Sequence, residues 1–344
     1  MLPAPSLPGS ACRAVRLRRL GAALFPLVWL LIASFGLLPA ARAEEVVVHA
    51  GLQLSGTVNW EADTMRHYGF DKDNGFRLEV TDVGVGPAAQ MALLSGGVDM
   101  IVSDWLWVAR QRALGKDLVF IPYSTAVGAL MVPRKSRAKT LADLKGKTIG
   151  VAGGPIDKSW LILRAYATKV EGFDLAGETK QVFAAPPLVY KAALDGDVKA
   201  ALNFWNFGAR MKAAGMKPLI DVTKAAAALG LDPAQPLLGY VVRGEVLAAH
   251  PGLADGIYFA SRQAKAYLAN YPEAFERLKP MMKVNSKAEF KALKAGYIAG
   301  IPFNEPVDEA AAGRMLTLMR SLGGTELLGD LTSLPDGVFY RVHH

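Results

Sequence analysis

Residues 86–107, GPAAQMALLSGGVDMIVSDWLW, constrain the fold more than any other stretch. Apolar residues near helical spacing followed by Gly96-Gly97 predict a short helix that ends at the glycines. The apolar run 98–102 predicts a strand of a parallel sheet. Ser103-Asp104-Trp105 then follows as an exposed polar and aromatic tip. In open α/β sheets ligands bind at the carboxyl ends of strands, so this tip predicts a binding site without a catalytic signature.

The first 43 residues have the layout of a secretory signal peptide. An arginine-rich start precedes the apolar run 20–38, and Ala41-Arg42-Ala43 supplies small residues where a signal peptidase cleaves. We therefore expect cleavage after Ala43 and a periplasmic protein. The alternative is a retained membrane anchor, because the apolar run nearly spans a bilayer.

Removal of this segment changes the charge and the cysteine count of the chain. Its five arginines account for much of the formal net charge of +8, which falls to about +3 in the mature chain. Such a charge does not predict nucleic-acid binding. Cys12 is the single cysteine of the sequence, so the mature chain has neither a disulfide nor thiol chemistry.

The rest of the chain alternates predicted strands and helices, which indicates an α/β protein with mainly parallel sheets. The polar stretch 133–137 suggests a boundary after the first group of elements, and the apolar stretch 237–242 suggests a crossing back. From Gly244 onward the pattern is mostly helical. Residues 188–206 repeat the order of 86–107: a helix, a turn with Gly and Asp, a strand, and an aromatic and polar tip.

Two blocks, residues 93–99 (LLSGGVD) and 141–151 (LADLKGKTIGV), resemble those of periplasmic solute-binding proteins of ABC importers. The resemblance is to the class that binds taurine, aliphatic sulfonates, nitrate and thiamine precursors. It implies two α/β lobes joined by two hinge strands, with lobe 1 at 44–128 plus 242–344 and lobe 2 at 129–241. It also implies a monomer that delivers a small ligand to an ABC permease, without catalytic residues, a resident metal or a required cofactor.

Ligand contacts are expected from four groups of residues that follow predicted strands, because those ends face the cleft in this fold. The candidates are Ser55, Thr57, Asn59, Trp60, Ser103, Asp104, Trp105, Gly154, Lys158, Trp160, Asn203, Trp205, Asn206 and Arg210.

These candidate residues predict a ligand that carries a negative charge and has a flat body. Trp105 and Trp205 are expected to form a clamp, one from each lobe, although tryptophans are often core residues. Gly153-Gly154-Pro155 before a predicted helix offers free N–H groups to an anion, with Lys158 in the first turn. Arg210 suits a sulfonate or carboxylate through paired donors.

Asp104 has several possible roles. It could bind an amine, order an arginine or help hold a metal, or it could cap the helix that follows.

Ligand identity leaves several hypotheses. The DWLW and NFWN blocks resemble those of pyrroloquinoline quinone binders, and this flat tricarboxylate is the favoured ligand. Taurine, an alkanesulfonate or nitrate are alternatives. An enzyme on the same scaffold, of the pyrimidine-precursor type, and a periplasmic chaperone without a transporter are others. The histidines lack metal-motif spacing, and no nucleophile elbow or phosphate loop is present.

Overall fold

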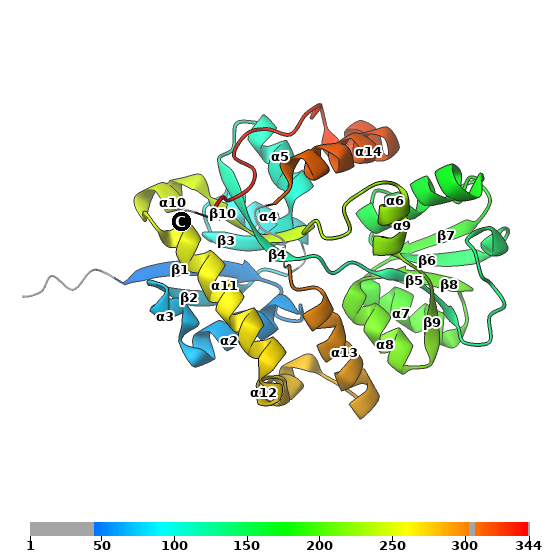
Figure 1. The fold of residues 1–344 in the computed structure, drawn as a ribbon, viewed down its shortest axis with the longest axis horizontal. Helices are drawn as coiled ribbons and strands as arrows, with labels where there is room; N and C mark the ends of the chain where they lie inside the picture. Colours follow the sequence, from blue (N-terminus) through cyan, green and yellow to red (C-terminus); the bar gives the residue numbers. More distant parts are fainter. Residues whose placement is uncertain (1–44, 85, 303–306, 343–344) are drawn as a thin grey trace, which may run out of the picture. The chain divides into compact units, whose positions relative to one another are not determined.

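The computed structural model describes residues 45–84, 86–302 and 307–342. Within them the chain forms two five-stranded sheets flanked by helices, which confirms the predicted fold class (Figure 1). The predicted signal peptide and its cleavage site after Ala43 lie outside the described residues. Across the described ranges, no helix combines the length and the hydropathy needed to cross a membrane.

The first sheet has the strand order β2-β1-β3-β10-β4. β1 pairs in parallel with β2 and β3, whereas β10 runs antiparallel to β3 and β4. Because β10 joins this sheet from Leu238 onward, residues 238–241 belong to it and not to the second lobe, where the sequence placed them. Its strands are β1 (Val46–Leu52), β2 (Phe76–Asp82), β3 (Met100–Asp104), β4 (Leu118–Ser124) and β10 (Leu238–Arg243).

The second sheet repeats this topology in the order β7-β6-β8-β5-β9. β5 is its antiparallel strand and pairs with β8 and β9. β5 and β10 are the strands that directly follow the two crossings between the sheets, so the reversed strand in each sheet is a consequence of the crossing. The strands are β5 (Ala129–Pro133), β6 (Thr148–Ala152), β7 (Lys180–Ala184), β8 (Ala200–Asn203) and β9 (Met216–Asp221).

Helices cover both faces of each sheet, and we call each sheet with its helices a lobe (Figure 1). In the first lobe they are α2 (Val58–Tyr68), α3 (Phe70–Asp73), α4 (Gly86–Leu94), α5 (Trp105–Ala113), α10 (Gly244–Ala249), α11 (Leu253–Asn270), α12 (Pro272–Met282) and α13 (Lys287–Ala299). In the second they are η2 (Ala142–Leu144), α6 (Lys158–Tyr166), η3 (Ala167–Glu171), α7 (Pro186–Asp195), α8 (Trp205–Ala213) and α9 (Val222–Ala228). The last helix, α14 (Glu309–Leu328), contacts both α5 and α6.

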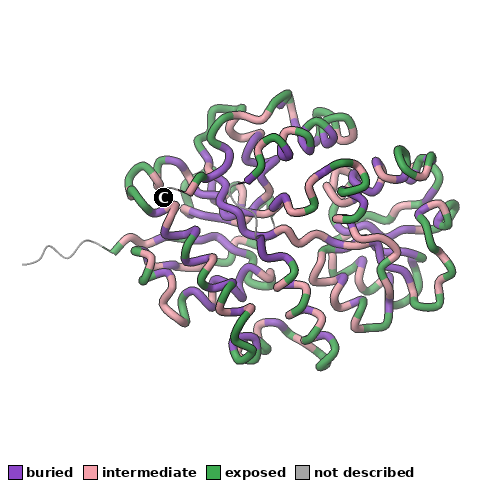
Figure 2. The backbone as a smooth tube through the Cα atoms, viewed as in Figure 1, coloured by how far each residue is buried: buried purple, intermediate pink, exposed green. Residues whose placement is uncertain are grey.

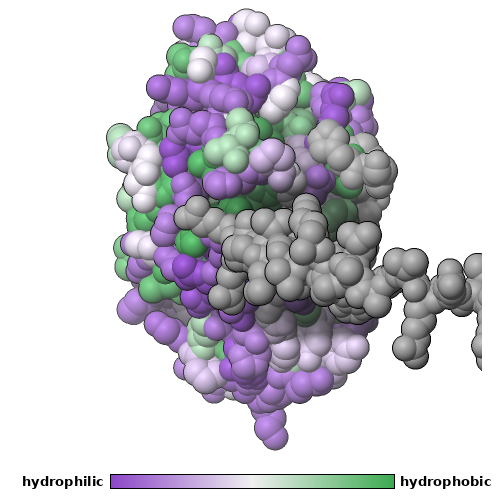
Figure 3. All heavy atoms as spheres, turned by 90° about the vertical axis from the view of Figure 1, so that its left-hand side faces the viewer, coloured by the Kyte–Doolittle hydropathy of each residue, from purple (hydrophilic) through white to green (hydrophobic). Residues whose placement is uncertain are grey.

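Neighbouring residues of the central strands point to opposite faces, as the period of two requires. Ile121 and Tyr240 pack with α2 and α11, whereas Phe120 and Val241 pack with α5 and α14. Burial is therefore concentrated along the strands, and exposed residues follow the outer sides of the helices (Figure 2). The face shown in Figure 3 carries mainly hydrophilic residues with smaller hydrophobic patches between them.

The unit predicted at residues 86–107 occurs once in each lobe. α4, β3 and α5 form it in the first lobe, and α7, β8 and α8 form it in the second. β3 and β8 occupy equivalent places beside the reversed strand. Gly96 and Gly196 have φ values of 77° and 82°, so each allows the left-handed turn that leads from the helix toward the strand.

A buried carboxylate joins distant parts of the first lobe. Glu61 on α2 accepts hydrogen bonds from Tyr240 and Ser261 through Oε1 (2.9 and 2.6 Å) and from Lys265 and Tyr297 through Oε2 (2.5 and 2.7 Å). We call these five residues the Glu61 hub. Burial, followed by the charge of Glu61, raises the pKa of the Tyr240 and Tyr297 phenols well above the usual value. Both phenols therefore stay neutral hydrogen-bond donors.

Removing the charge of Glu61 should destabilise the first lobe. Glu61→Gln leaves the Lys265 ammonium buried without a counter-ion, and we expect the free energy of unfolding to fall by about 3–5 kcal/mol. Glu61→Gln with Lys265→Met should regain most of the loss, because the amide oxygen still accepts from the phenols. Urea unfolding followed by circular dichroism measures both variants. A double variant no more stable than the single one would show that the uncompensated charge is not the cause.

Candidate functional site

Asp104 and Lys158 join the two lobes at the carboxyl ends of β3 and β6. Asp104 caps α5, since its Oδ1 accepts a hydrogen bond from the Trp107 backbone N–H at 3.0 Å. Its Oδ2 accepts a second one from Lys158 Nζ at 2.8 Å. Both side chains are partly buried. Asp104 thus acts as a helix cap, as one of the predicted alternatives stated, and in addition pairs with a cation of the other lobe.

The charge of Lys158 is maintained by its carboxylate neighbours. Burial acts to lower the pKa of Lys158, but the charge and hydrogen bond of Asp104, aided by Asp157, raise it above the ordinary value overall. Lys158 is therefore a permanent cation at physiological pH.

The helix that follows β6 begins later than the sequence predicted. The prediction had Gly153-Gly154-Pro155 open it, whereas α6 begins at Lys158 and its N-cap is Asp157, whose Oδ1 accepts from the Trp160 N–H at 3.1 Å. Burial is the main cause that raises the pKa of Asp157. The protein's own carboxylate thus caps the helix end at which an external anion was expected, and Gly154 lies in the preceding loop.

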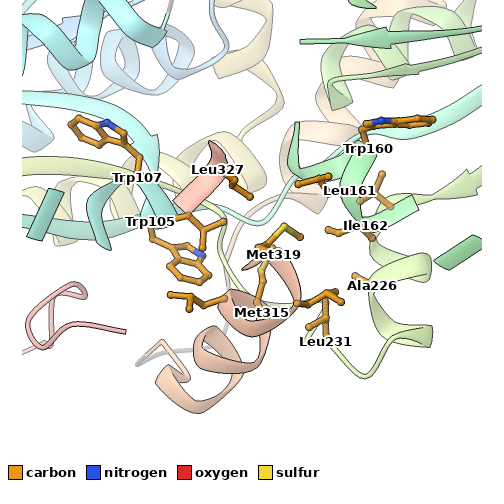
Figure 4. Packing of buried hydrophobic residues seen from close by; sticks show 14 of the residues in the cluster. Trp105, Trp107, Trp160, Leu161, Ile162, Ala226, Leu231, Met315, Met319 and Leu327 are labelled. Atoms are coloured by element: carbon orange, nitrogen blue, oxygen red, sulfur yellow. The ribbon is translucent and has the colours of Figure 1, made fainter. Parts of the chain in front are cut away.

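The prediction that Trp105 forms an exposed tip is wrong. Trp105 is fully buried and packs against Phe339, with ring centroids 5.7 Å apart. Burial of its large apolar area outweighs the indole N–H, which has no hydrogen-bond partner in the described part of the chain. Trp160 is also a core residue, and its ring lies at 76° to that of Phe183 with 6.3 Å between the centroids. In Figure 4, Met315 and Met319 of α14 lie between Trp105 and Leu161 of the second lobe.

The candidates after β8 mostly serve internal contacts. Asn203 is buried: its amide donates to the Pro186 carbonyl at 2.9 Å and its Oδ1 accepts from the Phe204 N–H at 2.9 Å. Trp205 is half-buried, with its ring perpendicular to that of Trp60 in the first lobe at 6.1 Å between centroids. Asn206 is half-buried in the first turn of α8.

Arg210 was expected to hold a ligand anion but faces protein groups. It forms an ion pair with Glu289 and donates to the backbone carbonyl of Met282 at 2.8 Å, both in the first lobe. This correction has a simple reason: the same planar donor set that suits a sulfonate also suits a carboxylate and a helix end.

The candidate residues after β1 differ in how exposed they are and in the hydrogen bonds that they already make within the protein. Ser55 is exposed and accepts from the Gln53 amide at 3.1 Å. Thr57 hydrogen-bonds the buried Tyr123 phenol. Asn59 and Trp60 are buried, and the Asn59 amide donates to the Gln53 carbonyl, which fixes the loop.

Ser103, at the end of β3, is also buried and accepts from the Gln90 amide at 3.2 Å.

Exposed apolar side chains at the strand ends were missed by the sequence reasoning. Phe183 lies near the end of β7 at 36% exposed, Phe204 follows β8 at 46%, and Leu188 lies in the first turn of α7 at 61%. In the first lobe Leu54 follows β1 at 52%. The signal was available, because each is an apolar residue beside a predicted strand end, where a solvent-facing loop should be polar.

In the described ranges no group of three histidine, cysteine or acidic residues is placed to hold a metal ion. The arrangement instead provides the Lys158 cation, paired with Asp104, and exposed apolar side chains at the strand ends. These features suit non-covalent binding of an anion with an apolar part.

The NMT1/THI5-like family profile matches residues 65–275, more than half of the chain. The chain belongs to the NMT1/THI5-like family. The periplasmic aliphatic sulphonate binding protein SsuA of Escherichia coli has the same fold, with a TM-score of 0.66, 18% identity, and coverage of 85% of this chain and 95% of that one. The predicted two-lobed fold is thereby confirmed, and the family is shown by the profile.

Two further solved structures share the fold. The alkanesulfonate-binding protein SsuA of Xanthomonas axonopodis pv. citri, bound to MOPS, has a TM-score of 0.66 and 18% identity over 87% of this chain and 100% of that one. A mutant of DszB in complex with biphenyl-2-sulfinic acid has a TM-score of 0.56 and 16% identity over 86% and 96%. No curated protein sequence matches the chain.

Asp157→Asn should strengthen anion binding at the start of α6. Asparagine also caps helices, so α6 should keep its stability, while a negative charge is removed. Loss of that repulsion, about 1 kcal/mol at a partly exposed site, predicts roughly fivefold tighter binding of sulfate in a calorimetric titration. Since burial raises the pKa of Asp157, the wild type should bind more tightly as the pH falls toward that pKa, and the variant should not. Equal pH profiles would contradict this role of Asp157.

Proposed function

We propose that the protein is the periplasmic solute-binding component of an ABC importer, that it binds a small organic anion between its two lobes, and that it delivers this anion to a permease. The family and the two-sheet fold support this function. Capture and release break no covalent bond, so the function needs neither catalytic residues nor a cofactor. A monomer suffices, since both lobes come from one chain.

The observation that carries the proposal is the position of Lys158. Its ammonium group lies at the carboxyl ends of the second sheet, where ligands bind in open α/β folds. Its partner, Asp104, comes from the other lobe, so Lys158 lies where the two lobes meet. A lysine ammonium has three N–H donors and Asp104 accepts one of them, so an anionic ligand between the lobes can accept another, and a charge-assisted hydrogen bond of this kind contributes about 1.5–3 kcal/mol.

The favoured ligand class is a sulfonate with an apolar part. The similar structures are described as binding an aliphatic sulphonate, MOPS and biphenyl-2-sulfinic acid, which are all organic sulfur oxyanions. Exposed Phe183, Leu188 and Phe204 offer apolar area at the same sheet edge. Nitrate and taurine have little apolar surface to bury there, so they should bind more weakly than a sulfonate with a longer chain or a ring.

Pyrroloquinoline quinone is the second candidate. It shares the negative charge and has a flat body that Phe183 and Phe204 could contact. The predicted tryptophan clamp does not favour it, because Trp105 lies in the core. The quinone therefore belongs in the ligand panel beside the sulfonates.

Lys158→Gln should weaken sulfonate binding at least tenfold, because it removes the cation but keeps a hydrogen-bond donor. Calorimetric titration of the mature chain with benzenesulfonate, pentanesulfonate, taurine, nitrate and the quinone measures this. Lys224→Gln is the matched control, since Lys224 is an exposed lysine of the same lobe. Tight binding of the quinone alone would replace the sulfonate assignment. Equal affinities of wild type and Lys158→Gln would refute the role of Lys158.

The alternatives of an enzyme or a chaperone predict different outcomes. A bound ligand recovered chemically unchanged after long incubation, as measured by mass spectrometry, agrees with a binding protein, whereas a converted ligand indicates an enzyme. Loss of ligand uptake after deletion of this protein distinguishes an importer component from a chaperone.

The exported protein should begin at residue 44. Mass spectrometry of the protein released from the periplasm by osmotic shock measures its N-terminus. A chain that retains residues 1–43 and stays with the membrane would contradict the signal peptide in favour of an anchor.

A further inference from the structure

Helix α8 of the second lobe packs closely on helix α13 of the first. The closest approach is at Gly296, where an added Cβ would lie 2.9 Å from the Trp205 ring. Such a distance is too short for ordinary contact, so a glycine is required for the two helices to approach this closely. The Trp205 ring also meets Trp60, which in turn packs against Tyr297 of α13.

Arg210, one turn further along α8, binds the corner between α12 and α13. It donates to the carbonyls of Met282 (2.8 Å) and Lys283 (3.4 Å) at the end of α12 and forms an ion pair with Glu289. The carboxyl end of a helix carries partial negative charge, so both parts of this corner attract the guanidinium group. Arg210 and Glu289 are largely buried, which protects the pair from screening.

The first-lobe side of this contact is rigidly placed. Tyr297, next to Gly296, donates to Glu61 at 2.7 Å and is thereby tied to α2, α11 and β10. α13 is thus tied to the first lobe through Tyr297 and packs on α8 of the second lobe.

The two ion pairs that join the lobes have the same polarity. The first lobe provides the carboxylates of Asp104 and Glu289, and the second provides Lys158 and Arg210. The two facing surfaces therefore carry complementary charges.

We propose that Trp205 and Arg210 of α8, with Gly296 and Glu289 of α13, form a closure seat that holds the lobes together without ligand and thereby sets the ligand affinity. This inference rests on the proposed function only in that the ligand binds between the lobes. A protein that closes without ligand has a larger binding-competent fraction, and its apparent dissociation constant is the intrinsic one divided by that fraction. The four residues are positioning residues, because they act through lobe closure and not through contact with the ligand.

Gly296→Ala is the most direct test. The added methyl group should block the approach of Trp205, while alanine within α13 favours the helix over glycine. We expect a larger radius of gyration by small-angle X-ray scattering in ligand-free protein, an unchanged or higher melting temperature, and about tenfold weaker benzenesulfonate binding. Gly313→Ala in α14 is the control, because a Cβ there meets nothing within 4 Å.

Arg210→Met tests the ionic part of the seat. We expect lobe separation in the same scattering measurement. In the wild type, the radius of gyration should change little from low to high sodium chloride, because the Arg210–Glu289 pair is largely buried and salt screens it weakly. Arg134→Met, at an exposed arginine of the second lobe, should behave as the wild type does.

The outcomes separate this inference from the proposed function. Unchanged radii of gyration and affinities in Gly296→Ala and Arg210→Met would refute the closure seat and leave the binding function standing. Expanded variants of a protein that binds no member of the ligand panel would support the seat and refute the proposed function.

Discussion

The buried carboxylate of Glu61 determines how the first lobe is put together. Its partners Tyr240 and Tyr297 lie 179 and 236 positions further along the chain. Apolar side chains in contact can shift relative to each other at little cost. A carboxylate in a region of low dielectric is stable only when a counter-ion balances its charge and hydrogen-bond donors use its lone pairs. This requirement selects one arrangement of α2, α11, α13 and β10. The same arrangement includes α13, the helix on which α8 of the second lobe packs.

Much of the fold could be predicted from the sequence, because it depends on short-range patterns. The unit at residues 86–107 and its repeat at 188–206 were recognisable from helical spacing, glycine and an apolar run, and both occur in equivalent places. The cap at Asp104 also depends only on neighbouring residues. The predicted return of the chain to the first lobe was a few residues too late. The sequence of an apolar strand that crosses between the lobes does not show which of the two sheets the strand joins.

The candidate site could be predicted only in part, for a physical reason. Arg210 and Trp205 have the chemistry that recognises a flat anion, but the same chemistry recognises a carboxylate, a helix end and another tryptophan. Which partner is used depends on the position of α13, which no local pattern contains. The Glu61 hub did leave a trace in the sequence, because Glu61 falls on the helical face of Val58 and Met65.

The hinge and the proposed ligand edge are mechanically connected through Gly128. An added Cβ at this residue, which immediately precedes β5, would lie 1.8 Å from the Asn203 carbonyl oxygen at the end of β8. Asn203 in turn joins Pro186 of α7 to Phe204. A rotation of the crossing strand about Gly128 must therefore move the edge that carries Phe204. Asn203, one of the predicted ligand contacts, thus lies against the crossing segment at Gly128 and is bonded to the edge that carries Phe204.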